Sequence, residues 1–167
     1  MTAKEKQSEF IKEYLKPLLK KHDYCIQGQT WWKDKGDFFI VANLQNYSWN
    51  SKESVDFCFN VGIALAKTLN DTLKKRPTVH DLTVYLREGA YLPADRKTHQ
   101  FRNHNGYFIN SSTAVNDFAF EFKKDFEEII LPQLEALKTL SDCLKYFEGV
   151  PFWSDQLKKA VEENDLL

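Results

Sequence analysis

The spacing of the apolar residues changes twice along this chain of 167 residues. At the two ends of the chain the apolar residues recur every three or four positions, and in the middle they alternate with other residues. The first spacing is typical of amphipathic helices, and the second is typical of strands that bury one face. The order of helix, strands and helices predicts an α+β fold and argues against a parallel doubly wound sheet.

The alternating region predicts four strands, at residues 24–34, 38–49, 55–63 and 80–88, and a further short strand at residues 106–110. Short connections favour an antiparallel meander of four to five strands, with the N-terminal helix and the C-terminal helices packed on one face. The connection at residues 64–77 is too long for a hairpin turn, so we expect a helical turn there. A chain of this length can bury one sizeable core, and we expect residues 1–167 to form a single domain.

Two prolines, Pro17 and Pro132, fall inside the helical regions. Proline has no N–H to donate and its ring clashes with the preceding turn of a helix. We therefore expect each helix to bend or restart at its proline.

The charge of the chain limits its partners. The formal net charge is -1, so no broad basic surface is available for nucleic acid or a membrane, and the basic stretches "LKKRP" and "RKTHQFR" are local. We find no signal peptide and no apolar run long enough to cross a bilayer. The expected protein is soluble and cytoplasmic, a monomer or weak dimer, with a protein or small-molecule partner and without nucleic acid or membrane partners.

No metal site or cofactor is expected from the cysteines and histidines. Cys25, Cys58 and Cys143 lie far apart and form no C-x-x-C pair, so we expect three small, buried, reduced thiols. His99 and His104 are five residues apart, which is the wrong spacing for two ligands on one helical face.

A row of polar and aromatic residues occupies the second face of the predicted sheet, opposite the apolar stripe Val55 to Ile63. Two interpretations remain open. The amides can satisfy one another as part of the fold, because a buried unpaired amide costs about 1–3 kcal/mol. They can also present donors and acceptors beside aromatic rings, as a recognition surface does. The candidate binding residues are Asn43, Gln45, Tyr47, Trp49, Asn60, Tyr85 and Arg87.

Trp31 and Trp32 must point to opposite faces if they lie in one strand. We expect Trp32 in the core and Trp31 on the other face, with stacking on a base or sugar as the alternative.

Catalytic residues are not predicted. We find no nucleophile beside a base, no paired carboxylates and no glycine-rich phosphate loop; His80, Asp81 and Arg87 are the candidates that could reach the polar face. We therefore expect a binding or interaction protein that uses the polar-aromatic face. The alternative is a small hydrolase or transferase with its site on the same face.

The stretch "VANLQNYSWNS" followed by "FCFNVGIAL" resembles a bacterial family known as domain of unknown function 4304. That family typically pairs an "N-L-Q" strand, ending in Ser and Trp or a similar residue, with an "F-x-[IV]-N-[LV]-G" strand. The leading helix and "ILPQLEAL" also look like the family, whereas its Arg-rich strand is represented here by "YLREGAYLP". The resemblance implies no activity, and a role like that of small bacterial immunity proteins is an analogy. The matching residues are Asn43, Leu44, Gln45, Ser48, Trp49, Phe57, Phe59, Asn60, Val61, Gly62 and, less closely, Arg87.

Overall fold

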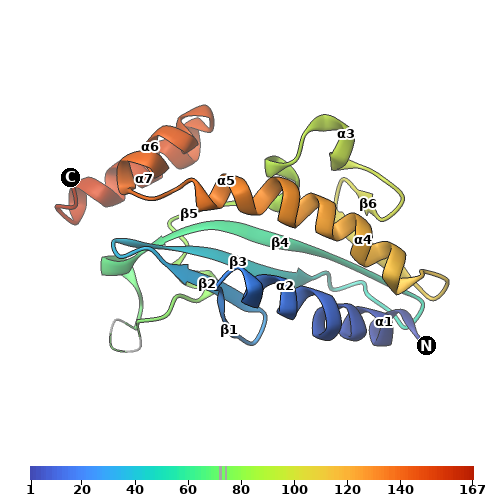
Figure 1. Cartoon of the computed structure of the whole chain (residues 1–167). Helices are drawn as coiled ribbons and strands as arrows, with labels where there is room; N and C mark the ends of the chain where they lie inside the picture. Colours follow the sequence, from blue (N-terminus) through green and yellow to red (C-terminus); the bar gives the residue numbers. More distant parts are fainter. Residues whose placement is uncertain (72, 74) are drawn as a thin grey trace.

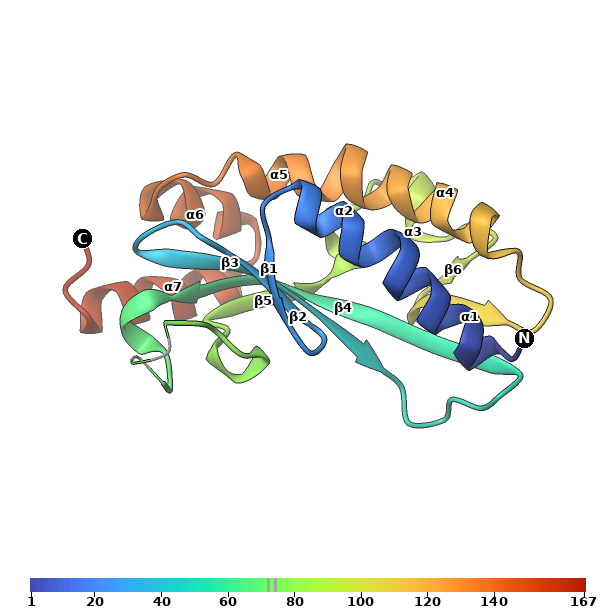
Figure 2. The ribbon, with the colours of Figure 1, turned by 60° about the horizontal axis from the view of Figure 1, so that its bottom comes forward.

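The structure is a computed structural model that describes residues 1–71, 73 and 75–167. It contains one antiparallel sheet, and the N-terminal helical segment and the one that begins at Val115 lie on the same face of it (Figures 1 and 2). The predicted α+β class is therefore confirmed. The strands are β1 (Cys25–Gln27), β2 (Thr30–Asp34), β3 (Phe38–Asn46), β4 (Ser54–Leu65), β5 (Val84–Arg87), β6 (Arg102–Asn103) and β7 (Gly106–Asn110). The α-helices are α1 (Ala3–Phe10), α2 (Lys16–Lys21), α3 (Ala94–Lys97), α4 (Val115–Asp125), α5 (Leu131–Glu135), α6 (Leu140–Tyr146) and α7 (Pro151–Glu163).

The winding of each long helix changes just before its proline, and the helix continues through it. A π-helical turn, Ile11–Leu15, joins α1 to α2, and a second, Phe126–Ile130, joins α4 to α5. Pro17 and Pro132 are each the second residue of the α-helix that follows. A wider turn relieves the clash of the ring with the backbone and absorbs the missing N–H. Both helices therefore continue across the sheet.

Strand β4 organises the sheet, because it has two partners along one edge. Strands β1 to β4 form the predicted meander, in the order β1-β2-β3-β4. On the other edge of β4, β7 pairs with Ser54–Phe57 and β5 pairs with residues 60–63. The sheet therefore has seven strands in the described residues, more than the four to five expected, because the twelve-residue β4 has room for both. The predicted strand at residues 106–110 is β7.

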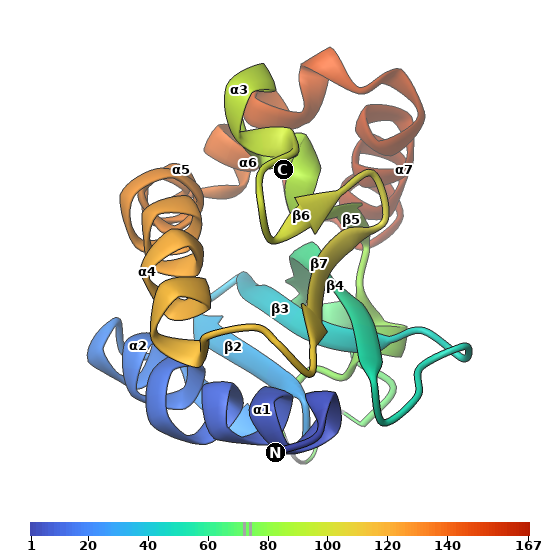
Figure 3. The same ribbon diagram turned by 90° about the vertical axis from the view of Figure 1, so that its right-hand side faces the viewer.

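The main core lies between the sheet and the helices. Figure 3 shows these two layers from the side. The predicted apolar stripe of β4 is buried there, with at most 1% exposure at any of its five residues. The ring centroid of Phe59 lies 4.9 Å from that of Phe126 and 5.7 Å from that of Phe122. The stripe residues are Val55, Phe57, Phe59, Val61 and Ile63.

The two tryptophans point the opposite way from the prediction. Trp31 is 1% exposed in the main core, and Trp32 packs on the second face. The expected single strand is a hairpin, with Ile26 opposite Trp31 and a two-residue turn begun by Gly28 at φ 59°. The turn reverses the chain and so changes which residues share a face.

The cysteines are free, but not all of them are buried. Cys58 and Cys143 are buried, as expected, whereas Cys25 is exposed because it lies in β1, at the edge of the sheet. None of the described helices is both long and apolar enough to cross a membrane.

Candidate binding surface

A network of hydrogen bonds made by amide side chains spans strands β2, β3 and β4 on the second face of the sheet. Asn60 of β4 stands directly between Asn43 of β3 and Arg87 of β5. The Asn60 Nδ2 group donates to Asn43 Oδ1 at 3.3 Å and to Gln45 Oε1 at 3.0 Å. Asn43 Nδ2 in turn donates to Thr30 Oγ1 at 3.0 Å. Asn60 is only 4% exposed, so these bonds satisfy a buried amide and fix the side chain of Gln45.

Arg87 is anchored by this amide network and reaches solvent. Its Nη1 donates to Gln45 Oε1 at 3.2 Å and contacts Cys58 Sγ. The Arg87 residue is exposed, and a guanidinium carries five N–H donors, so most of its donors remain open to a ligand.

Cys58, beside Arg87, is a poor nucleophile. Burial raises the pKa of its thiol, although Arg87 and Tyr47 both act to lower it. A thiolate is the reactive form of cysteine, so a raised pKa keeps Cys58 in its inert form at neutral pH.

Tyr47 and Trp49 form one aromatic rim of the surface. Their rings stack with centroids 4.4 Å apart, and Trp49 Nε1 donates to Asp56 Oδ2 at 2.9 Å. The Tyr47 hydroxyl donates to the Asn105 carbonyl at 2.6 Å. Burial, followed by a hydrogen bond with Cys58, raises the pKa of Tyr47 to about 12, so the phenol stays neutral. Trp49 remains 58% exposed, which leaves its ring available for contact.

A second aromatic rim lies beyond Arg87. Tyr85 is 39% exposed and its ring centroid is 4.9 Å from that of Trp153 in α7. Trp153 also contacts Phe152, whose ring is exposed. The structure therefore brings the seven sequence-predicted residues onto one face and adds Trp153, whose distance in sequence concealed it.

The described residues of the segment 66–82 cover another part of the second face. Phe39, Val41, Ala64 and Leu69 form a small second core there, against which Trp32, Ala66 and Leu82 pack. The predicted helical turn in residues 64–77 is found at Ala66–Thr68, and positions 72 and 74 of that segment lie outside the described residues. Leu82 faces this second core instead of the main one, because β5 begins only at Val84.

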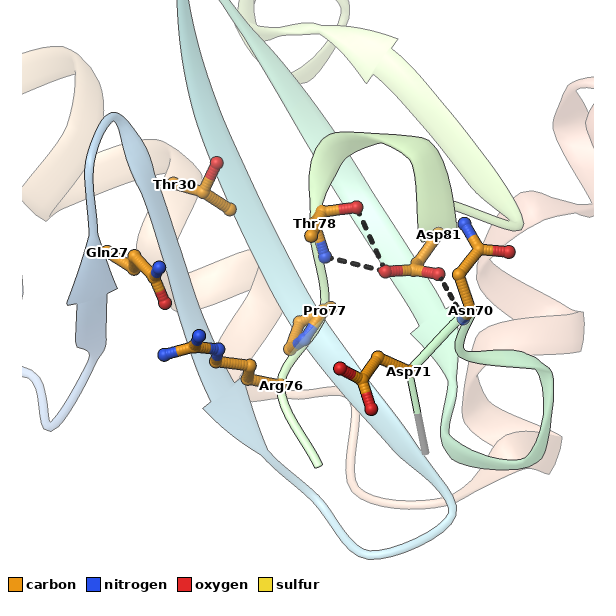
Figure 4. Close-up of a pocket in the computed structure, with 8 residues that line it drawn as sticks. All are labelled: Gln27, Thr30, Asn70, Asp71, Arg76, Pro77, Thr78 and Asp81. Atoms are coloured by element: carbon orange, nitrogen blue, oxygen red, sulfur yellow. Dashed lines mark hydrogen bonds between the residues drawn. The ribbon is translucent and has the colours of Figure 1, made fainter. Parts of the chain in front are cut away.

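Asp81 holds the covering loop together. Its carboxylate accepts the backbone N–H groups of Asn70 and Thr78, both at 2.7 Å, and the Thr78 hydroxyl at 3.0 Å (Figure 4). The loop and the β1–β2 hairpin line a pocket of about 320 Å³. Gln27 and Thr30 are the residues of the hairpin that line it. His80, the neighbour of Asp81, is exposed. Asp81 thus has a structural role in this loop.

Two buried carboxylates, Glu88 and Asp125, are not marked by the sequence pattern. Glu88 pairs with Arg102, Oε1 to Nη1 at 3.0 Å, and burial raises the pKa of Glu88 even though Arg102 lowers it. In the sequence, Glu88 and Arg102 look like ordinary surface residues. Only the path of residues 88–102 brings the two side chains together. Arg102 also lies over the Tyr107 ring, 4.4 Å from its centroid.

Asp125 is the second buried carboxylate, with 0% exposure. It accepts hydrogen bonds from Arg96 at 2.7 Å, Tyr107 at 2.8 Å and His99 Nε2 at 3.0 Å. Burial alone would raise the pKa of Asp125, but these three partners hold it below its ordinary value. His99 Nδ1 accepts the Phe101 N–H at 3.1 Å, so both ring nitrogens are engaged and His99 is not placed as a general base. Across residues 1–71, 73 and 75–167, no three His, Cys, Asp or Glu side chains are grouped to hold a metal ion.

Gly62 of the motif has a clear steric reason. A Cβ atom at this position would lie 1.8 Å from the Val84 carbonyl oxygen, because the backbone of β5 approaches Gly62 closely. The residue that follows Asn60 and Val61 in "N-V-G" must therefore lack a side chain if β5 is to pair and bring Arg87 beside Asn60.

Comparison with known proteins gives one result. No curated protein and no solved structure matches the chain. A family model described as domain of unknown function (DUF4304) matches residues 15–136, which include all seven predicted binding residues but not Trp153. The match covers well over half of the chain, and the protein therefore belongs to the DUF4304 family.

Proposed function

We propose that this domain is a bacterial, cytoplasmic binding protein that recognises a protein partner through its polar-aromatic face. We define this face as Asn43, Gln45, Tyr47, Trp49, Asn60, Tyr85, Arg87 and Trp153. The role closest in kind is that of an immunity protein, which neutralises a partner by covering its surface. No reaction is needed for such a role.

The observation that carries the proposal is the way in which Arg87 is held. Its Nη1 bonds to Gln45, whose Oε1 is itself fixed by buried Asn60. An interface pays an entropy cost for every side chain that it orders, and a side chain already ordered avoids most of that cost. Arg87 is thus pre-organised while most of its donors face solvent.

The aromatic rims support the same proposal. Trp49 and Tyr85 are both exposed, and each is braced by a neighbouring ring at 4.4 Å or 4.9 Å. Tryptophan, tyrosine and arginine are the residues that most often dominate the energy of protein interfaces. A pair of rigid aromatic rims on either side of a guanidinium provides both contact area and direction.

The experiment compares partner capture by the wild type with that by Trp49→Ala and Arg87→Ala. Phe120→Ala is the matched control, since Phe120 is 61% exposed but lies on α4. A captured protein is then purified and its affinity measured by calorimetry for all four chains. We expect each face variant to weaken binding by about tenfold or more and the control to bind as the wild type does. Equal binding by all four chains would refute the proposal.

A further inference from the structure

A groove with a positive rim lies away from the polar-aromatic face, between the N-terminal helix and the β1–β2 hairpin. Its volume is about 590 Å³, and Lys12, Lys16 and Lys20 line it together with Ile26 and Trp31. Figure 2 shows the helix and the hairpin side by side. Because Trp31 belongs to the main core, the groove opens on the helix-covered side of the sheet, at the β1 edge.

The three lysines form a row along one side of the helix. They follow one another at intervals of four residues, which is about 6 Å along a helix. Lys12 has an ion pair with Glu13 at 3.8 Å, but both side chains are exposed, and such pairs contribute little. Lys16 and Lys20 have no ion pair with any residue that the structure describes, and no carboxylate lines the groove.

The floor of the groove is apolar and includes an exposed side chain. Ile26 is 42% exposed, whereas Trp31, opposite it in the hairpin, is buried. All three residues of β1 are exposed, and this strand pairs only with β2 among the described residues. An apolar side chain placed against Ile26 would remove apolar surface from water, at about 25 cal/mol per Å².

We propose that this groove binds an acidic segment of a protein partner. Carboxylates spaced along the segment meet the row of lysines, and an apolar side chain between them packs against Ile26. A single small anion cannot contact three ammonium groups spread over about 12 Å of helix, whereas a chain of carboxylates can. A recessed apolar floor suits a side chain better than it suits the flat surface of a bilayer.

The test uses a fluorescent heptapeptide, acetyl-Glu-Glu-Leu-Glu-Leu-Glu-Glu, and measures its anisotropy with the full chain. Two variants disrupt the groove: Lys16→Glu with Lys20→Glu, and Ile26→Asp. The control is Lys145→Glu with Lys158→Glu, which makes the same change of charge at exposed lysines of α6 and α7. Probes with lysine in place of glutamate, or alanine in place of leucine, separate the charged contribution from the apolar one.

We expect the acidic peptide to bind the wild type and the control alike, and both groove variants to bind about tenfold more weakly. Adding salt to about 0.5 M should also weaken binding, because exposed charges are screened. The proposal is overturned if the peptide does not bind, if the control loses as much affinity, or if Ile26→Asp has no effect. Binding to phosphatidylserine vesicles but not to the peptide would assign the groove to a membrane surface instead. Because none of these residues lies on the polar-aromatic face, the outcome is independent of that of the partner-capture experiment.

Discussion

The carboxylate of Glu88 accepts the backbone hydrogen bond that a neighbouring strand would otherwise accept from Phe59. Its Oε2 accepts the Phe59 backbone N–H at 3.2 Å, at the point of β4 where β7 has ended and β5 has not begun. The other oxygen pairs with Arg102. One side chain thus completes the hydrogen bonding of the central strand and neutralises a buried guanidinium.

Replacing Glu88 should therefore be costly. Glu88→Ala leaves a buried Arg102 unpaired and a buried N–H without an acceptor, and we expect a loss of about 3–5 kcal/mol in unfolding free energy. Glu88→Gln keeps the acceptor for Phe59 and should lose less. Denaturant unfolding of both variants measures the difference, and a loss below about 1 kcal/mol for Glu88→Ala would contradict the role assigned to this residue.

The ring of Phe59 is fully buried under the helices. We expect Phe59→Ala to reduce the unfolding free energy by about 3–5 kcal/mol, since a cavity remains between β4 and α4. Phe120→Ala, which removes an exposed ring of α4, should change it by less than about 0.5 kcal/mol. Similar losses for the two variants would mean that burial does not account for the effect.

The amide network should contribute to the stability of the fold, and the exposed residues Trp49 and Arg87 should not. Asn60→Ala removes the donor to both Asn43 and Gln45 and should cost about 1–3 kcal/mol. Trp49→Ala and Arg87→Ala should each change the unfolding free energy by less than about 1 kcal/mol, because both residues are exposed. The opposite order in denaturant melts would make the polar-aromatic face part of the core and remove it as a binding surface.

Asp125 should make the fold sensitive to acid. Its pKa is lower in the folded protein than in the unfolded chain, where the ordinary value is 3.8. The unfolded chain therefore binds a proton first as the pH falls, and the stability that Asp125 contributes is present above about pH 4 and lost below it. Melting temperatures measured at about pH 6 and about pH 3 should differ less for Asp125→Asn than for the wild type. An equal difference in both proteins would show that other carboxylates carry the acid sensitivity.

The thiols should differ in reactivity. Cys25 is exposed, Cys58 and Cys143 are buried, and burial raises the pKa of Cys143 to about 12. A disulfide-exchange reagent should therefore titrate one thiol in the native protein and three after denaturation. Rapid reaction of Cys58 in the native protein would show that the polar-aromatic face opens in solution.

The sequence pattern predicts some elements of this fold well and others poorly, for physical reasons. The stripe of β4 and the polar row opposite it follow from strict alternation, which a buried face requires. The pattern places Trp31 on the wrong face, because a turn of only two residues, begun by Gly28, leaves little trace in the pattern yet reverses the faces. The pattern does not mark Glu88 and Asp125, because their partners Arg102 and Arg96 lie in the two-residue β6 and the four-residue α3, which are too short to show a periodicity.

The π-helical turns before Pro17 and Pro132 bear on how this chain compares with others of its family. A π turn holds one residue more than an α turn of the same length, so each long helix contains one surplus residue. Deleting a single residue between Ile11 and Leu15, in a chain that also has another residue in place of Pro17, would regularise the helix while leaving both of its ends, and hence the residues that face the core, where they are. In an alignment, a one-residue gap at either place would thus mark a straighter helix in an unchanged fold.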